Sequence, residues 1–209
     1  YKFIPTVNDT SSEFYSKGNI LNGKMDGKWT FWHEWDNQVQ SEGNYIENYK
    51  DGKHIEFNGN GQKLNEKNFK NRKEHGKQTT WYKSGQMQNE INFKDGIANG
   101  REIHWFQKNG QISLDLNYKD GELHGKRSEW SENGQLLKEM NYQDGEFHGE
   151  WSEWYENGQL VSKRNYKGGL PLGLVENYDL DGFMWQSTTY NDRGVTHGPA
   201  IKWSKEGRY

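Results

Sequence analysis

The sequence contains two sets of side chains whose types could carry out catalysis or bind a metal. The first is a pair of glutamates that occurs twice, as Glu129 with Glu132 and as Glu153 with Glu156. Paired carboxyl groups act as acid and base in glycoside hydrolysis, but only where one cleft gives them unequal environments and so separates their pKa values. Because the pair recurs in successive segments with no obvious pocket, we interpret these glutamates as solvated strand residues.

The second set is a series of histidines at equivalent positions, His75, His124, His148 and His197. If each belongs to a β-hairpin, equivalent positions in adjacent hairpins lie two strands apart, or about 10 Å. Ligands of one metal ion must each reach it within about 2.1 Å, so these histidines are not expected to share an ion. We expect each histidine to hydrogen-bond a backbone carbonyl beside a turn or to pack on an aromatic ring.

The rest of the composition gives no support for an enzyme or a cofactor. The chain has no cysteine and no G-x-S-x-G or H-E-x-x-H motif, and its glycines lack the strand–turn–helix setting of a phosphate-binding loop. Its net charge of −3 provides no basic footprint for nucleic acid. We therefore predict a non-enzymatic protein with no metal, no cofactor and no nucleic-acid partner.

The glycines instead define eight copies of a repeat of 24 or 25 residues. An aromatic side chain follows the first glycine of every repeat by five residues, and a Phe or Tyr follows the second glycine of most repeats by eight. The first glycines are Gly27, Gly52, Gly76, Gly100, Gly125, Gly149, Gly173 and Gly198, and the aromatic residues are Trp32, Phe57, Trp81, Trp105, Trp130, Trp154, Tyr178 and Trp203.

Each repeat has the pattern of a β-hairpin. In GQISLDLNY, residues 110–118, apolar and polar side chains alternate, which is typical of a strand with one buried face. Pairs such as Asp120-Gly121 and Asn133-Gly134 are typical of hairpin turns, and Gly149 and Gly158 are likewise expected to set turns.

The faces of the strands favour one kind of loop. A three-residue loop at residues 132–134, with Gly134 in the left-handed conformation, pairs Trp130 with Leu136 and aligns both with Met140 and Tyr142. In the fourth repeat one additional residue precedes the second glycine. Either Trp105 or Phe106 is then the inward aromatic residue there.

These patterns predict an all-β, elongated repeat protein of eight hairpin repeats that form a twisted antiparallel meander over residues 14–209. Residues 1–13 fall outside the repeat and are predicted to be a tail or cap. Only 30% of the residues are hydrophobic but 15% are aromatic, so we expect stability to come from stacked aromatic rows and not from a central core.

Repeats of the type NYKDGELHGKRSEWSENGQL resemble the variant MORN repeat of bacterial proteins, many of which are labelled as antitoxins of the YwqK type. The resemblance covers about residues 14–207. It implies an elongated antiparallel β-structure that binds a partner, and it supplies no catalytic residues. Some repeats depart from the pattern: Leu172 stands where other repeats have His, and Lys50 and Asp51 precede Gly52. These departures mark either caps or partner-specific surface.

Five aromatic residues are candidates for partner binding because strand alternation places them opposite Trp32, Trp81 and Trp154. Trp and Tyr dominate the energetic centres of protein interfaces. If the second face is open, they form part of a binding surface; if the ribbon twists or doubles back, they are buried within the chain. The candidates are Trp29, Phe31, Tyr82, Trp151 and Tyr155.

Three functions are compatible with such a repeat protein. The first is a protein-interaction scaffold, with an antitoxin or immunity protein as the specific form that the family resemblance implies. The second is a cell-wall or carbohydrate-binding array, in which repeated aromatic residues stack on sugar rings. The third is attachment to a membrane surface, which the balance of 27 basic and 30 acidic residues disfavours.

Two further expectations concern assembly and location. Unpaired edge strands invite association between copies of the chain. The location is cytoplasmic, or extracytoplasmic if a signal peptide preceding Tyr1 was removed.

Overall fold

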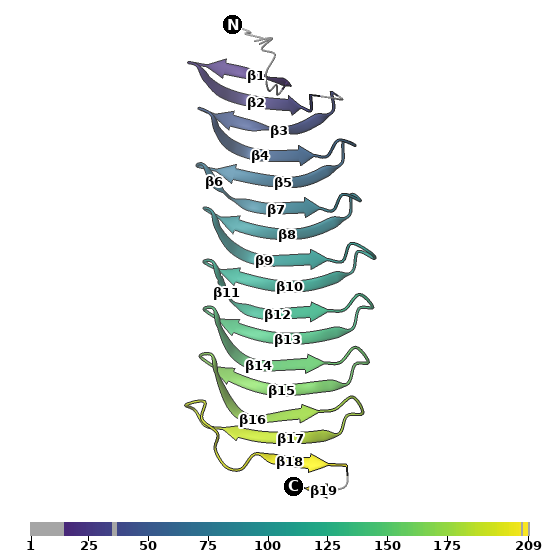
Figure 1. The fold of residues 1–209 in the computed structure, drawn as a ribbon. Helices are drawn as coiled ribbons and strands as arrows, with labels where there is room; N and C mark the ends of the chain where they lie inside the picture. Colours follow the sequence, from purple (N-terminus) through teal and green to yellow (C-terminus); the bar gives the residue numbers. More distant parts are fainter. Residues whose placement is uncertain (1–14, 35–36, 206, 209) are drawn as a thin grey trace. The chain divides into compact units, whose positions relative to one another are not determined.

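The computed structural model describes residues 15–34, 37–205 and 207–208. All of the regular secondary structure in these residues is β-strand (Figure 1). No helix that could cross a membrane is found in this part of the chain. The predicted tail or cap, residues 1–13, lies outside the described residues. The chain divides into two compact units, residues 1–98 and residues 99–209, and each is an open antiparallel meander.

In unit 1, each strand pairs with its neighbours in the sequence, so the chain runs back and forth across one sheet. A backbone irregularity at His75 separates β6 from β7, because its N–H bonds the carbonyl of Asn68 instead of continuing the ladder. The strands are β1 (Tyr15–Leu21), β2 (Lys24–Trp32), β3 (Val39–Ile46), β4 (Tyr49–Phe57), β5 (Lys63–Lys70), β6 (Lys73–Glu74), β7 (Gly76–Trp81) and β8 (Met87–Lys94).

Unit 2 continues the same hairpin pattern, and His124 separates β11 from β12 in the same way. β9 (Ile97–Trp105) spans the division between the units and pairs with β10. The other strands are β10 (Ile112–Lys119), β11 (Glu122–Leu123), β12 (Gly125–Trp130), β13 (Leu136–Gln143), β14 (Glu146–Trp154), β15 (Leu160–Lys167), β16 (Leu170–Tyr178), β17 (Met184–Tyr190), β18 (Ile201–Ser204) and β19 (Gly207–Arg208). The all-β hairpin-repeat prediction is confirmed.

Two kinds of turn alternate along each unit. The tight turns have two central residues, both with positive φ, as at Asp120 (51°) and Gly121 (90°); this geometry matches the twist of a hairpin. The wider loops have three central residues: Ser131 N donates to the carbonyl of Gln135 at 2.9 Å, and residues 132–134 lie between them. Gly134 has a φ of 85° and donates to the carbonyl of Ser131 at 3.0 Å. The predicted three-residue loop and left-handed Gly134 are confirmed.

The fourth repeat accommodates its additional residue in the loop. Phe106 N donates to the carbonyl of Gln111, and Gly110 N donates back to Phe106, so four residues lie between the bonded pair. Trp105 pairs with Ile112, as the equivalent aromatic residues do elsewhere. Trp105 therefore takes the repeated aromatic position, and Phe106 begins the loop.

The predicted alignment of the large apolar side chains is wrong. Trp130 does pair with Leu136, but Glu129 pairs with Lys138, so Leu137 is an additional residue in β13. One inserted residue reverses the alternation of side chains along a strand. Trp130 and Leu136 consequently lie on the face opposite to Met140.

The first glycine of each of the first seven repeats lies within a strand, which corrects the expectation that Gly149 sets a turn. Gly149 is in β14 with a φ of 85° and lies opposite Tyr166 of β15. Positive φ is inexpensive only for glycine. The glycine thus allows a bulge in the strand, while Gly158, also with a φ of 85°, does lie in a loop as predicted.

Alternation along the strands defines two faces in each unit. We call the Trp face the one that carries the repeated aromatic row, Trp32 to Trp203. The Tyr face carries the Phe and Tyr residues that pair with the first glycines, such as Tyr142 opposite Gly125. Few apolar side chains are fully buried on a single sheet. Among the described residues these are Trp29, Leu116, Met140 and Val175.

Candidate interaction surfaces

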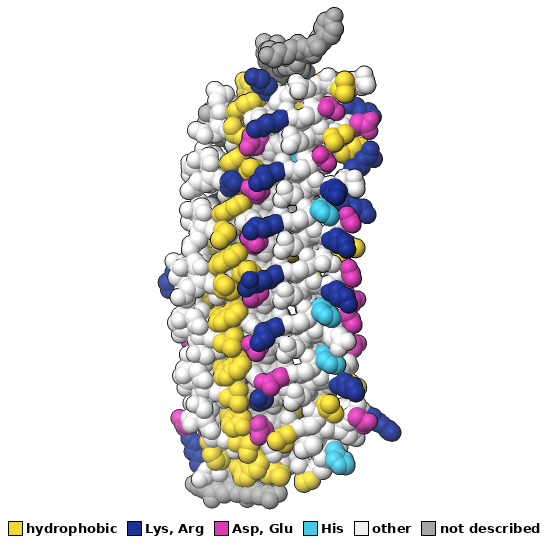
Figure 2. Space-filling view, turned by 180° about the vertical axis from the view of Figure 1, so that it is seen from behind, with side chains coloured by type: hydrophobic (Ala, Val, Ile, Leu, Met, Phe, Trp, Pro, Cys, Tyr) yellow, Lys and Arg dark blue, Asp and Glu magenta, His cyan; other side chains and the backbone are white. Residues whose placement is uncertain are grey.

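The Trp face presents a half-buried aromatic row. In both units each described member of the row is partly exposed, and Figure 2 shows a stripe of hydrophobic side chains running over successive strands. Trp81 borders a shallow hollow of about 440 Å³ lined by Gln62, Lys63, Ser84 and Gly85. The ammonium of Lys63 lies 5.4 Å from the centre of the Trp81 ring. The sequence expectation that this row points inward is corrected, because no described element covers it.

A ladder of charged pairs flanks the aromatic row on the same face (Figure 2). Each pair joins neighbouring strands, and most of the cations are exposed, so each pair contributes little to stability on its own. At Glu66, desolvation opposes ionisation, but hydrogen bonds from Lys53 and Lys63 hold the pKa of this carboxyl below its usual range. The pairs are Lys28–Glu42 (2.9 Å), Lys53–Glu66 (2.6 Å), Lys77–Glu90 (2.6 Å), Arg101–Asp115 (2.6 Å), Lys126–Glu139 (2.8 Å) and Lys163–Glu150 (3.1 Å).

On the Tyr face of unit 1, aromatic rings form a continuous ladder across β2 to β5. Trp29 stacks on Phe31 with ring centres 5.9 Å apart, and Phe31 meets Tyr45 edge to face at 6.3 Å. His54 lies between Tyr45 (5.0 Å) and Phe69 (5.3 Å). Trp29 and Phe31 thus lie side by side in this ladder.

Trp29 is nevertheless a structural residue and not an exposed recognition residue. It is only 6% exposed, and its indole nitrogen donates to the carbonyl of Asn19 at 3.2 Å. Its ring occupies the space above Gly18, where any side chain would overlap it. Of the two alternatives that the sequence left open, Trp29 follows burial within the chain, because a neighbouring glycine makes room for the indole against the backbone.

The Tyr face of unit 2 carries a polar cluster at the same strand positions. Glu102 is only 8% exposed and its Oε1 lies 2.6 Å from Nε2 of His104. Desolvation, together with a hydrogen bond to Glu102, raises the pKa of Tyr118. Nearby, Arg127 forms an ion pair of 2.5 Å with Glu129. The charged and polar groups of this cluster therefore pair with one another.

Trp151 also lies on the Tyr face of unit 2, in β14. It is half-buried, and the guanidinium of Arg164 lies 4.3 Å from its ring centre. A cation held over a tryptophan is favourable and partly covers the ring. Trp151 is therefore partly exposed, but Arg164 covers one face of its ring.

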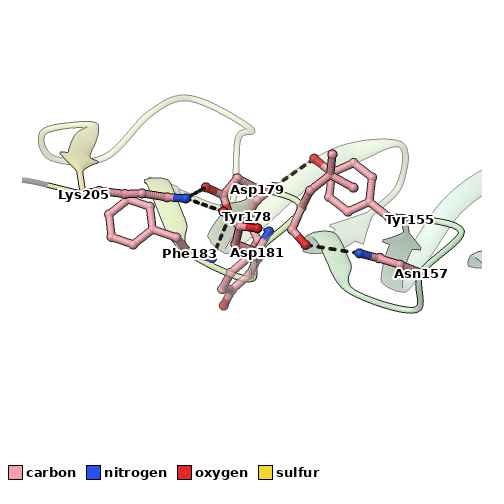
Figure 3. A network of polar contacts seen from close by, with 8 residues as sticks. Tyr155, Asn157, Tyr178, Asp179, Asp181, Phe183 and Lys205 are labelled. Atoms are coloured by element: carbon pink, nitrogen blue, oxygen red, sulfur yellow. Dashed lines mark hydrogen bonds and ion pairs between the residues drawn. The ribbon is translucent and has the colours of Figure 1, made fainter.

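Tyr82 and Tyr155 each begin a wide loop, at a position where other repeats have His, Asn, Phe, Ser or Asp. Tyr82 is half-buried and its N–H donates to the carbonyl of Gln86. The hydroxyl of Tyr155 donates to the carbonyl of Tyr178 at 3.2 Å (Figure 3). Tyr155 is thus used to connect the loops of successive hairpins.

The same network continues at the next loop (Figure 3). Asn157 donates to the carbonyl of Leu180 at 3.2 Å, and Asp179 accepts the backbone N–H groups of Asp181 and Phe183. These hydrogen bonds lower the pKa of Asp179, and the bond from the Phe183 N–H has the largest effect. Lys205 pairs with both aspartates, and its pKa is raised, chiefly by Asp181. These contacts connect the wide loops of successive hairpins, and both Asp179 and Asp181 are paired with Lys205.

The repeated glutamate pairs and the histidine series do not form a shared site among the described residues; the members described below contact other partners. Glu132 pairs with Lys108 at 3.1 Å, and Glu153 pairs with Lys138 at 3.5 Å. His75 contacts the carboxylate of Asp95 at 3.3 Å. The related His124 makes the same contact with the aspartate of the next tight turn. The partner of these histidines is therefore a turn aspartate, where a carbonyl or an aromatic ring was expected.

Two repeated features of the structure were not predicted from the sequence. The charge ladder of the Trp face could be found from the cation that follows the first glycine, as at Lys28, Lys53 and Lys77. The second is an asparagine before the repeated Phe or Tyr: Asn68 and Asn141 each donate to a carbonyl of the following hairpin. Its side chain thereby satisfies a carbonyl beside the bulge.

Comparisons with known proteins agree with this architecture. No curated protein matches the chain. MORN repeats are generally associated with protein or membrane interactions. Three segments, residues 74–95, 123–144 and 147–167, match the family described as "MORN repeat variant".

Proposed function

We propose that the chain is a non-catalytic protein-interaction scaffold whose partner docks on the Trp face. The observation that supports this proposal is the half-buried aromatic row, which recurs at one position of successive hairpins and is not covered by a described element. Large aromatic side chains at a surface supply much of the binding energy of protein interfaces. The adjacent charge ladder supplies register and specificity, since the sign of its charges alternates across the strands from β2 to β13.

The more specific form of this proposal is an antitoxin or immunity protein that covers a cognate toxin. Its support is the resemblance of the repeats to the YwqK-type family. A sheet face of several hairpins is large enough for a standard interface, which needs about 800 Å² on each partner. Phe31 on the Tyr face and Tyr82 in a wide loop of unit 1, and separately Trp151 on the Tyr face of unit 2, remain candidates for further binding surfaces.

The test is affinity capture from the source organism, followed by calorimetry with the purified partner. The Trp130→Ser, Trp154→Ser variant alters the Trp face, and Trp151→Ser is the matched control on the Tyr face. We expect a stoichiometric protein that binds the wild type and the control but not the double variant. If the Trp151→Ser control alone failed to bind that protein, the binding site would be on the Tyr face instead. For the antitoxin form, co-expression should relieve growth arrest caused by the captured protein.

The aromatic row also favours a carbohydrate-binding array as a second candidate. Equivalent tryptophans of adjacent hairpins lie about 10 Å apart, a spacing that suits stacking on alternate rings of an extended glycan. Capture of cell-wall material without a stoichiometric protein, with quenching of tryptophan fluorescence on adding glycan, would support this candidate over the scaffold.

A further inference from the structure

The tight turns of unit 1 form an edge with a distinct composition. Four turns, residues 21–24, 46–49, 70–73 and 94–97, succeed one another along this edge (Figure 1). Backbone hydrogen bonds link the second turn to the residue after the first, and the fourth turn to the residue after the third: Asn48 N donates to Met25 O at 3.1 Å, and Gly96 N donates to Glu74 O at 2.7 Å. We call these four turns the basic edge.

The basic edge is apolar as well as charged. Leu21 is 58% exposed, Ile46 54%, Tyr49 47% and Ile97 52%, and each directly flanks a turn. The equivalent turns of unit 2 expose one large apolar residue in these positions, Leu170.

The charges of the two edges also differ. Unit 1 has five cations and two carboxylates in its turns, whereas residues 119–122, 143–146 and 167–170 of unit 2 have two cations and four carboxylates. In unit 1, Lys70, Lys73 and Lys94 form no ion pair with any described residue. The charged groups of the basic edge are Lys24, Glu47, Lys70, Arg72, Lys73, Lys94 and Asp95.

Two of these turns depart from the use of glycine, and the departure creates the contacts at the centre of the edge. Asn48, with a φ of 72°, and Arg72, with a φ of 66°, stand where the other two turns have glycine, although left-handed backbone favours glycine. The guanidinium of Arg72 lies 3.7 Å from the centre of the Tyr49 ring. Glu47 lies 3.7 Å from both Arg72 and Lys24. These contacts orient the guanidinium over an exposed aromatic ring.

We propose that the basic edge binds an acidic protein segment that also contains apolar side chains. The planar guanidinium of Arg72 is suited to a carboxylate, and the unpaired lysines supply a field of the complementary sign. Leu21, Ile46 and Ile97 provide apolar contacts between the cations. This surface is separate from the Trp face, so it extends the proposed function to a second site.

A protein segment is favoured over an anionic membrane. Glu47 occupies the centre of the edge, between two cations, where it would face the lipid charge of a flat bilayer. A polypeptide can place a cation opposite Glu47 and carboxylates beside it. The net charge of −3 also lowers the attraction of the whole chain to anionic lipid.

The experiment measures binding of the full chain to fluorescent synthetic peptides of equal apolar content that are acidic, neutral or basic. The central variant is Arg72→Gly, because glycine suits the backbone of this turn and removes only the side chain. The matched control is Lys167→Ala, which removes a cation from a tight turn of unit 2. Vesicles of phosphatidylcholine with phosphatidylserine serve as the membrane probe.

We expect the acidic peptide to bind most tightly. Arg72→Gly should weaken the binding of this peptide about tenfold, while the melting temperature of the variant is unchanged or higher than that of the wild type. Lys70→Glu with Lys73→Glu should abolish binding, and Lys167→Ala should leave it unchanged. Equal binding of acidic and basic peptides, or equal affinity of Arg72→Gly and the wild type, would overturn the proposal. Binding to the vesicles without binding to the acidic peptide would overturn it in favour of a membrane.

Discussion

The indole of Trp29 lies directly against the backbone of Gly18 on the neighbouring strand, so that a Cβ at Gly18 would overlap the ring. The same relationship recurs between His54 and Gly43. A glycine on one strand thus allows the large side chain of the next strand to be buried on a single-layered sheet. The burial of Trp29 depends on this pairing.

Replacing Gly18 with Ala should destabilise unit 1 by about 1–3 kcal/mol, because the added methyl group must displace the Trp29 ring. The measurement is the urea midpoint of unfolding. A Trp29→Leu background is the control, since the smaller side chain leaves space and the cost of Gly18→Ala should decrease there. An equal cost in both backgrounds would show that the ring is not the cause.

The stability of unit 1 should decrease as the pH falls below about 6.5, because of His54. Burial is the largest influence on His54 and lowers its pKa, although its Nε2 lies 2.6 Å from the carbonyl of Asn44. The unfolded chain therefore binds the proton first, and protonation favours unfolding until the pH is below the folded pKa. Thermal melts at pH 5 and pH 7.5 should show this loss.

His54→Phe is the variant that isolates this effect. It keeps an aromatic ring between Tyr45 and Phe69 but cannot be protonated, so the loss on acidification should be smaller than in the wild type. If the variant loses as much stability at low pH, other groups, such as the carboxyl of Glu66 with its lowered pKa, control the acid response.

The contact of Glu102 with His104 should show coupling in a double-mutant cycle. Glu102→Leu alone leaves His104 without this partner, and His104→Leu alone leaves a buried carboxylate, so each should cost about 1–3 kcal/mol. Replacing both should cost less than the two single changes together. Additive costs in chemical denaturation would contradict a stabilising contact.

Gly134→Ala should cost about 1–2 kcal/mol, because its φ of 85° is unfavourable for any residue with a Cβ. Glu132→Ala in the same loop is the control and should change stability by less than about 0.5 kcal/mol. Urea denaturation compares the two variants. A similar, small effect of both would show that the loop tolerates another conformation.

The sequence by itself determined the hairpin repeat. The spacing of the glycines and of residues such as Trp130 and Trp154 predicted the strands, the tight turns and the three-residue loop at Gly134, because turn geometry depends on local φ values that few residues adopt. The sequence also placed the histidine series beside turns, but it did not identify turn aspartates as the partners of His75 and His124.

The tertiary structure alone decided which side chains are buried. Strand alternation placed Trp29 opposite the repeated aromatic row, but it could not show that Gly18 makes room for the indole on the neighbouring strand. The additional residue Leu137 likewise reverses the faces of Trp130 and Met140. Burial on a single-layered sheet depends on the sizes of the cross-strand neighbours and on bulges, and both are set by register between strands and not by periodicity within one strand.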